Sequence, residues 1–252
     1  MITPEEIKTA QRCISYASRM GASASRVYLN KCVTDSYTIL NGELDKVTHS
    51  ADRSIYLYLF VDGRYGTFST NRFDEEELEA FVSKAIDMVR MLGEDGCRRL
   101  PDPARTAKDA VTGLELGLYD PQYETMDAET RLANARRLCI YEKIASGQKG
   151  YRLISEECEY SCTSDDSYTA DSQGFEGRHR ETTFGTFSEM TIEDTEGNKY
   201  SGYWWQATPK ASETDFEGCG RKALERAVNQ IGPKKRRSGK YRMVVDTSVS
   251  SR

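Results

Sequence analysis

The hydrophobic pattern is clearest between residues 55 and 70, where it predicts two strands joined by a tight turn. Aliphatic residues alternate with Tyr and Phe over residues 55–60, so both faces of the first strand are largely apolar. Asp62-Gly63 is a favoured two-residue hairpin connection, because glycine tolerates the positive φ that such a turn needs. A helix is expected directly afterwards, with Asp74 as its N-cap, Glu77 completing a capping box, and apolar residues recurring every three or four positions.

The rest of the chain repeats this mixture of helices and strands. Thr3 and Glu6 predict a capping box at the start of a helix that Gly21 ends. Asn41-Gly42 is a second hairpin signal, and Asp165-Asp166 is interpreted as part of a turn. A further helix is predicted at 127–146, and the last helix is expected to have Ser212 as its cap and to end at Gly232-Pro233. Further strands are predicted at 24–31, 34–40, 45–50, 153–163, 167–172, 178–192 and 199–208.

These elements predict an α+β protein with two consecutive units of antiparallel sheet packed with helices, followed by the start of a C-terminal domain. The expected division is 1–103 for an N-terminal domain, 104–126 for a connecting segment, 127–236 for a central domain and 237–252 for the first strand of a truncated C-terminal domain. Because the chain ends just inside that strand, we expect it to be a fragment of a longer protein.

Composition narrows the function classes. A net charge of −5 argues against a nucleic-acid binder, which usually presents an electropositive surface. The chain has no apolar run long enough to span a bilayer, and it opens Met-Ile-Thr-Pro-Glu-Glu without a signal peptide, so we expect no membrane contact and a cytoplasmic location. Its seven cysteines lack the paired Cys-x-x-Cys spacing of a structural zinc site and are expected to be reduced thiols.

One aromatic cluster is the main candidate for a binding surface. Tyr203, Trp204 and Trp205 lie on a predicted strand, where Trp204 and Trp205 face opposite sides. At most one of the two is then fully in the core, and the other is available to line a peptide or partner surface; packing against the sheet is the alternative for both. His49 and His179 lack converging partners in the sequence and are interpreted as surface residues.

Several short motifs resemble the TldD/PmbA family, the modulator of DNA gyrase type of peptidase. Each is weak alone, and their order and spacing along nearly the whole chain carry the resemblance. The ending Ser69-Thr70 of the first hairpin is more similar to the PmbA branch than to the TldD branch. The motifs are residues 41–46, 62–66 with 69–70, 73–78, the turn 171–175 that is similar to the asparagine/serine-glycine turn of the central domain, and 240–246 that is similar to the first strand of the C-terminal domain.

The resemblance implies a role in a zinc metalloprotease system. In the TldD branch a His-Glu-x-x-x-His helix follows the C-terminal strand, and such spacing places two imidazoles on one helical face beside a general base. This chain has only His49 and His179, neither followed by Glu. The resemblance therefore implies a PmbA-like component without a catalytic residue or cofactor of its own, acting with a TldD-type protease subunit on extended peptides, as a dimer or hetero-oligomer, in cytoplasmic peptide maturation or degradation.

Two alternatives stay open. The full-length protein is an active metallopeptidase if a zinc motif lies beyond Arg252, and zinc is then expected there rather than in this chain. The other alternative is that the chain is a freestanding scaffold or binding module unrelated to proteolysis.

Overall fold

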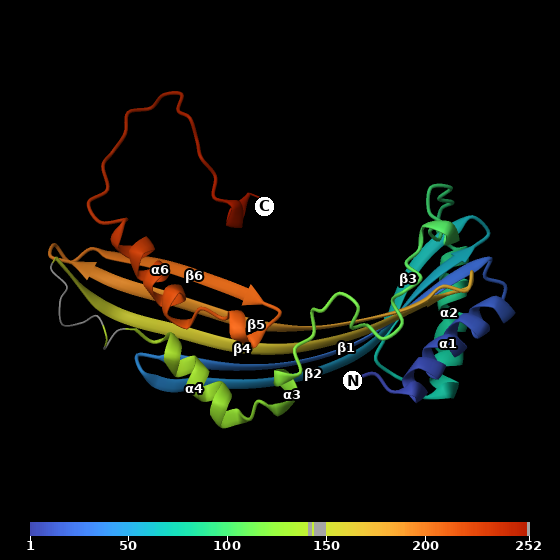
Figure 1. Cartoon of the computed structure of the whole chain (residues 1–252). Coiled ribbons are helices and arrows are strands. Elements are labelled where there is room, and N and C mark those ends of the chain that lie inside the picture. Colours follow the sequence, from blue (N-terminus) through green and yellow to red (C-terminus); the bar gives the residue numbers. More distant parts are fainter. Residues whose placement is uncertain (141–142, 144–149, 251–252) are drawn as a thin grey trace.

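The computed structural model describes residues 1–140, 143 and 150–250 and has one antiparallel sheet with the strand order β3-β2-β1-β4-β5-β6 (Figure 1). Helices pack against this antiparallel sheet, and the combination confirms the predicted α+β fold. The strands are β1 (Ala24–Leu40), β2 (Glu43–Val61), β3 (Arg64–Thr70), β4 (Tyr151–Asp171), β5 (Glu176–Asp194) and β6 (Lys199–Thr208); the helices are α1 (Pro4–Arg19), α2 (Glu75–Arg90), α3 (Gln122–Thr125), α4 (Ala128–Leu138) and α6 (Phe216–Val228).

The strands of the two predicted units join into a single sheet. β1 pairs with β2 on one side and with β4 on the other, from Arg26 opposite Asp171 to Leu40 opposite Glu157. Several predicted breaks are also absent, because 24–31 with 34–40, 45–50 with 55–61, and 153–163 with 167–172 each form one long strand. The turn predicted at Asp165-Asp166 is wrong, since both residues lie inside β4. The domain boundaries stay predictions.

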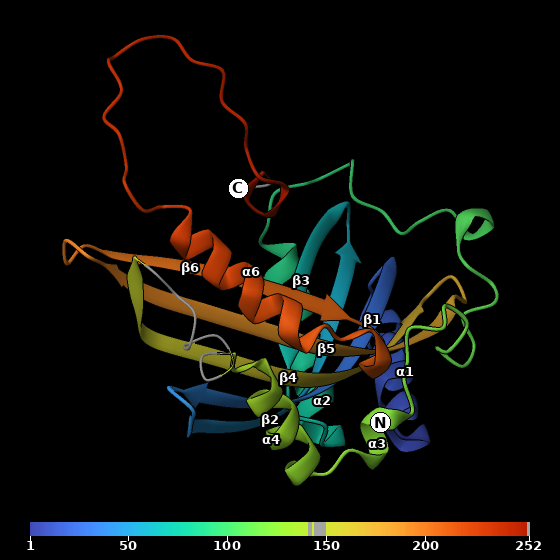
Figure 2. The same cartoon turned by 60° about the vertical axis from the view of Figure 1, so that its left-hand side comes forward.

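The two faces of the sheet differ in what covers them. Val27 and Leu29 of β1 are buried under α1 and α2, whereas Tyr37 and Ile39 are buried under α4 and α6 at the other end of the strand. All four are odd-numbered and strand side chains alternate, so both helix pairs cover the same face. Figure 2 shows α4 and α6 across one end of the sheet, with α1 and α2 at the other.

The opposite face carries none of these helices, and we call it the open face. It consists of the even-numbered residues of β1, of β2 from Lys46 onward, and the odd-numbered residues of β4 from Ser155 onward, β5 and β6. Most of its residues along β4 and β5 are half-buried. None of the described helices is long and apolar enough to cross a membrane.

Local signals account for most element ends, with three corrections. The turns Asn41-Gly42 and Asp62-Gly63 have positive φ at both residues, as a type I′ hairpin requires. Asp74 is the N-cap residue of α2, as predicted, but its side chain makes no capping bond, so the capping box predicted with Glu77 is not formed. Ser212 does not cap α6, because Asp215 accepts the Gly218 N–H bond at 2.8 Å instead. The strand expected over 240–246 is not formed, since none of the described strands pairs with these residues. The predicted helix beyond Ile140 falls largely outside the described residues.

The capping box of α1 is tied to the sheet through Glu6. Its carboxylate accepts bonds from the Thr3 N–H (2.8 Å), Arg53 (3.0 Å) and Lys31 (3.2 Å). Burial alone raises the pKa of Glu6, but these three donors outweigh it and lower the pKa from 4.5 to about 2. The carboxylate form is therefore stabilised by folding.

This shift predicts a stability change with pH. The pKa of Glu6 is lower in the folded state than in the unfolded state. Its contribution to the free energy of unfolding is therefore complete above about pH 4.5 and disappears as the pH falls through 2. We expect Glu6→Gln to lower the free energy of unfolding by about 2 kcal/mol at pH 7, a value discounted because Arg53 is partly exposed. Urea unfolding from pH 7 to pH 2 measures this, and a wild-type/variant difference that does not shrink with acid would contradict it.

Candidate functional site

The predicted aromatic cluster lies on β6, at one border of the sheet. Tyr203 and Trp205 project from the open face and are 44% and 53% exposed. Trp204 projects from the other face and packs beneath α6, where the Arg226 guanidinium lies 4.5 Å from its ring. The two tryptophans therefore lie on opposite faces, as strand alternation predicts, and Trp204 is half-buried beneath α6.

A third aromatic residue completes the cluster on the open face. Phe187 of β5 lies directly opposite Trp205 in the strand register. Its ring also stacks on Tyr203, with ring centroids 6.3 Å apart and an interplanar angle of 26°. The sequence does not reveal Phe187 as part of the site, because its position depends on the register between β5 and β6.

Small residues form the next row of the open face beside these aromatics. Ser36, Ser161, Gly185 and Ala207 lie opposite one another across β1, β4, β5 and β6. A side chain at Gly185 would meet the Ser161 hydroxyl, so the row is low and closely packed. An extended chain lying along β6 would therefore pass first the aromatic surface and then the flat surface of these small residues.

The backbone of β6 offers hydrogen-bonding groups on its outer edge. The Asp194 N–H donates to the Asn198 carbonyl at 2.9 Å, which makes these residues a hydrogen-bonded pair at the β5–β6 turn. In an antiparallel ladder the bonded pairs alternate, so even-numbered residues of β6 point their backbone groups at β5 and odd-numbered ones point away. The Ser201 carbonyl already accepts a bond from the Gln230 side chain (2.5 Å). The outward N–H and C=O groups of Tyr203, Trp205 and Ala207 then remain to bind a further strand.

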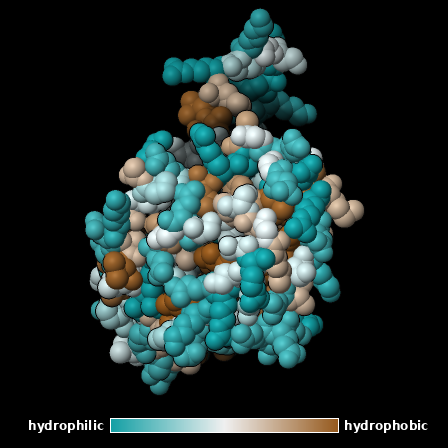
Figure 3. All heavy atoms as spheres, turned by 90° about the vertical axis from the view of Figure 1, so that its right-hand side faces the viewer, coloured by the Kyte–Doolittle hydropathy of each residue, from teal (hydrophilic) through white to brown (hydrophobic). Residues whose placement is uncertain are grey.

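No strand pairs with this outer edge in the part of the chain that the structure describes. The remaining edge of β5 is covered, because Arg178, Arg180 and Thr182 donate backbone bonds to the connecting segment at Ala110, Gly113 and Leu118. At the end of the molecule carrying α1 and α2, Figure 3 shows mainly hydrophilic residues with scattered apolar ones. The outer edge of β6 together with Tyr203, Trp205 and Phe187 is therefore the candidate site.

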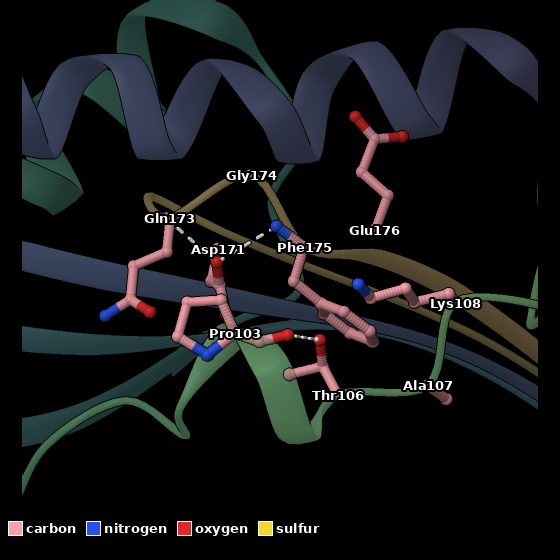
Figure 4. Close-up of a pocket in the computed structure, with 9 residues that line it drawn as sticks. All are labelled: Pro103, Thr106, Ala107, Lys108, Asp171, Gln173, Gly174, Phe175 and Glu176. Carbon is pink, nitrogen blue, oxygen red and sulfur yellow. Dashed lines mark hydrogen bonds between the residues drawn. The ribbon is translucent and has the colours of Figure 1, made fainter.

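The turn motif at 171–175 lines a different hollow. A pocket of about 440 Å³ lies between this turn and residues 103–108 (Figure 4). The buried Asp171 carboxylate accepts bonds from the Gln173 N–H (2.9 Å) and the Phe175 N–H (3.2 Å), and Arg26 lies 3.4 Å from it. These contacts explain the motif as turn chemistry, because its carboxylate organises the β4–β5 hairpin.

The two histidines lie apart and make local pairs. His49 Nδ1 lies 2.7 Å from the Asp35 carboxylate across the β1–β2 pair, and Arg131 lies 3.1 Å from the same Asp35. His179 Nε2 lies 3.1 Å from Glu181 on the same strand. No group of three or more His, Cys, Asp or Glu residues is placed to hold a metal ion among the residues that the structure describes.

All seven cysteines are free thiols. Cys158 and Cys162 are buried on the helix-covered face, and burial raises the pKa of the Cys13 thiol to about 12. Cys139 follows the last residue of α4 and is half-buried against the core beneath α4 and α6.

Two family profiles match most of the chain. Residues 26–89 match the PmbA/TldA metallopeptidase domain 1, and residues 123–231 match the PmbA/TldA metallopeptidase central domain. Comparison with curated proteins gave no match.

Solved structures from three organisms have the same fold. A modulator of DNA gyrase from Bacteroides thetaiotaomicron is 34% identical with a TM-score of 0.86, over 100% of this chain and 56% of its own length. A modulator of a DNA gyrase from Thermotoga maritima is 17% identical with a TM-score of 0.67, over 92% and 50%. TldE from Thermococcus kodakarensis is 12% identical with a TM-score of 0.63, over 87% and 47%. The chain thus spans about half the length of the proteins that it resembles.

Proposed function

The chain belongs to the PmbA/TldA metallopeptidase family, and from this membership we propose that it is part of a PmbA-like component of a TldD/PmbA-type zinc metalloprotease system. In this role the chain binds substrate and has no catalytic residue, while a TldD-type subunit supplies the zinc site. Its two histidines lie on opposite faces of the sheet and on different strands, which supports a non-catalytic role for the described part of the chain. The setting is cytoplasmic maturation or degradation of peptides.

The free outer edge of β6 is the observation on which the substrate class rests. An extended peptide added to this edge bonds to the outward backbone groups of Tyr203, Trp205 and Ala207, and such bonds do not depend on the peptide sequence. Every second peptide side chain then lies over the open face beside Trp205 and Tyr203, where aromatic surface favours apolar groups. The proposed ligand is therefore an unfolded peptide bound with little sequence preference.

This proposal predicts the effect of two substitutions on β6. Ala207→Pro removes an outward N–H without touching the bonds to β5, and we expect it to weaken peptide binding about fivefold, the value of one backbone hydrogen bond. Trp205→Ala removes the exposed ring and is expected to weaken binding about tenfold. Fluorescence anisotropy of a labelled ten-residue valine/serine peptide measures both.

The matched control is Tyr56→Ala, which removes another partly exposed aromatic side chain of the open face at the far end of the sheet. It should bind the peptide as the wild type does. Equal losses in all three variants, or none in Ala207→Pro, would argue against binding at the β6 edge.

A second candidate function follows from length. The Bacteroides relative extends well beyond the matched region, so a zinc motif in the corresponding part of the full-length protein would make it a peptidase in its own right. Full-length protein that contains zinc and cleaves unfolded peptides without any partner would favour this candidate; cleavage only after addition of a TldD-type protein would favour the first.

A further inference from the structure

A second free edge lies on the opposite side of the sheet. β3 pairs with β2 only from Ile55 onward, so residues 43–54 of β2 have β1 on one side and no strand on the other among the described residues (Figure 1). We call residues 43–54 the free β2 edge. Leu44 and Val47 on it are 43% and 53% exposed, although both are aliphatic. Long strand edges of this kind are templates for pairing with another chain.

The direction of the backbone groups on this edge follows from the neighbouring hairpin. Val61 and Arg64 flank the two-residue turn and form its closing hydrogen-bonded pair, so odd-numbered residues of β2 point away from β1. The bond from the Ser23 N–H to the Phe60 carbonyl (2.9 Å) agrees, since it places an even-numbered residue toward β1. The outward groups of the free β2 edge therefore belong to Val47, His49, Ala51 and Arg53.

The charges on the free β2 edge are self-complementary. When a second copy is placed antiparallel and centred on His49, Lys46 lies opposite Asp52 and Asp45 lies opposite Arg53. The two-fold axis of the dimer repeats each pair, so the interface contains two Lys46–Asp52 contacts and two Asp45–Arg53 contacts. No like charges face each other. If the second copy were centred on Thr48 instead, the only opposite-charge pair would be Glu43 with Arg53. If it were centred on Ser50, there would be no charge pair.

We propose that two copies of this chain associate through the free β2 edge, antiparallel about His49, and join their six-stranded sheets into one. The outward N–H and C=O groups supply the ladder, and the Lys46–Asp52 pairs on the open face fix the register. Arg53 is also held by Glu6 (3.0 Å), and Asp45 lies at a register shift of β2, so the Lys46–Asp52 pair is the better one to test.

Charge reversal tests the pairing. Lys46→Asp and Asp52→Lys each place two like-charge contacts at the interface, and we expect each to raise the dimer dissociation constant at least tenfold in sedimentation-velocity experiments. Mixing the two variants should restore association, because every contact between them is again Asp opposite Lys. Lys84→Asp on α2 changes the net charge by the same amount as Lys46→Asp and should leave the dimer intact.

A cysteine at the centre tests the register directly. In the proposed dimer the two His49 Cα atoms form a hydrogen-bonded pair about 5.5 Å apart, within the range that a disulfide spans. His49→Cys in a Cys97→Ser background is expected to form a covalent dimer on mild oxidation, whereas Glu43→Cys, six residues away, should not. A monomeric wild-type protein, cross-linking of both variants alike, or failure of the mixed variants to associate would overturn the proposal.

Discussion

Replacing Gly202 with alanine is expected to lower the free energy of unfolding by about 3 kcal/mol, the upper end for an overpacked site. Gly202 lies in β6 on the face beneath α6 and is buried. A Cβ atom there would lie 2.5 Å from the Ala223 carbonyl oxygen and closer still to the Ala227 amide nitrogen. Both are backbone atoms of α6, so no side-chain rotation relieves the clash and the helix must move.

The matched control is another glycine of the same region, Gly185→Ala. Its new methyl group would meet only the hydroxyl of Ser161, which is able to rotate, and we expect a change below about 1 kcal/mol. Urea unfolding of both variants measures the difference. If the two cost the same, close approach of α6 to β6 is not what requires Gly202.

Movement of α6 should also reach the candidate site. The Trp204 carbonyl accepts a bond from the Cys219 thiol of α6 (3.4 Å), and its ring lies beneath Arg226 of the same helix. These contacts hold β6 in place while Tyr203 and Trp205 stay exposed on the other face. Gly202→Ala is therefore expected to weaken peptide binding without altering any residue of the open face.

The elements that could be predicted from the sequence are those fixed by neighbouring residues. Asp62-Gly63 specifies its hairpin because the turn needs two residues with positive φ. Thr3 and Glu6 begin α1 with reciprocal bonds three residues apart. The strand predicted at 199–208 matches β6, since turn signals lie at one end and a proline beyond the other.

The joined sheet could not be predicted, because its strands change character along their length. β4 is apolar where helix pairs cover it and polar in the middle, where Asp165-Asp166 suggested a turn. The partners that make this polar centre stable are Arg178 and Ile2, which lie 12 and 164 residues from Asp166. The local sequence pattern therefore predicts a break at a point where contacts with distant residues keep the strand continuous.

The candidate site was predicted in part for the same reason. Tyr203 and Trp205 stand out from composition and alternation alone. Phe187, and the fact that β6 is a border strand, depend on register and strand order, which no short segment specifies.

Neutralising Asp166 is the second substitution expected to have a large effect. Its carboxylate is 2% exposed and accepts bonds from Arg178 Nε (2.9 Å), Arg178 Nη2 (2.7 Å) and the Ile2 N–H (2.7 Å). The hydrogen bonds that Arg178 donates to Asp166 raise the pKa of Arg178, so its guanidinium stays charged. Together they attach the N-terminal residues to the centre of the helix-covered face.

We expect Asp166→Asn to lower the free energy of unfolding by about 3 kcal/mol, because it leaves the Arg178 cation largely buried without a counter-charge. Asp87→Asn, in an exposed pair with Arg90 on α2, is the control and should cost less than about 0.5 kcal/mol. Replacing both partners, Asp166→Leu with Arg178→Met, removes the buried charges and should recover most of the loss. Urea unfolding at pH 7 compares the three. If the double variant is less stable than Asp166→Asn, the cost comes from the Ile2 contact and the shape of the site rather than from an unpaired charge.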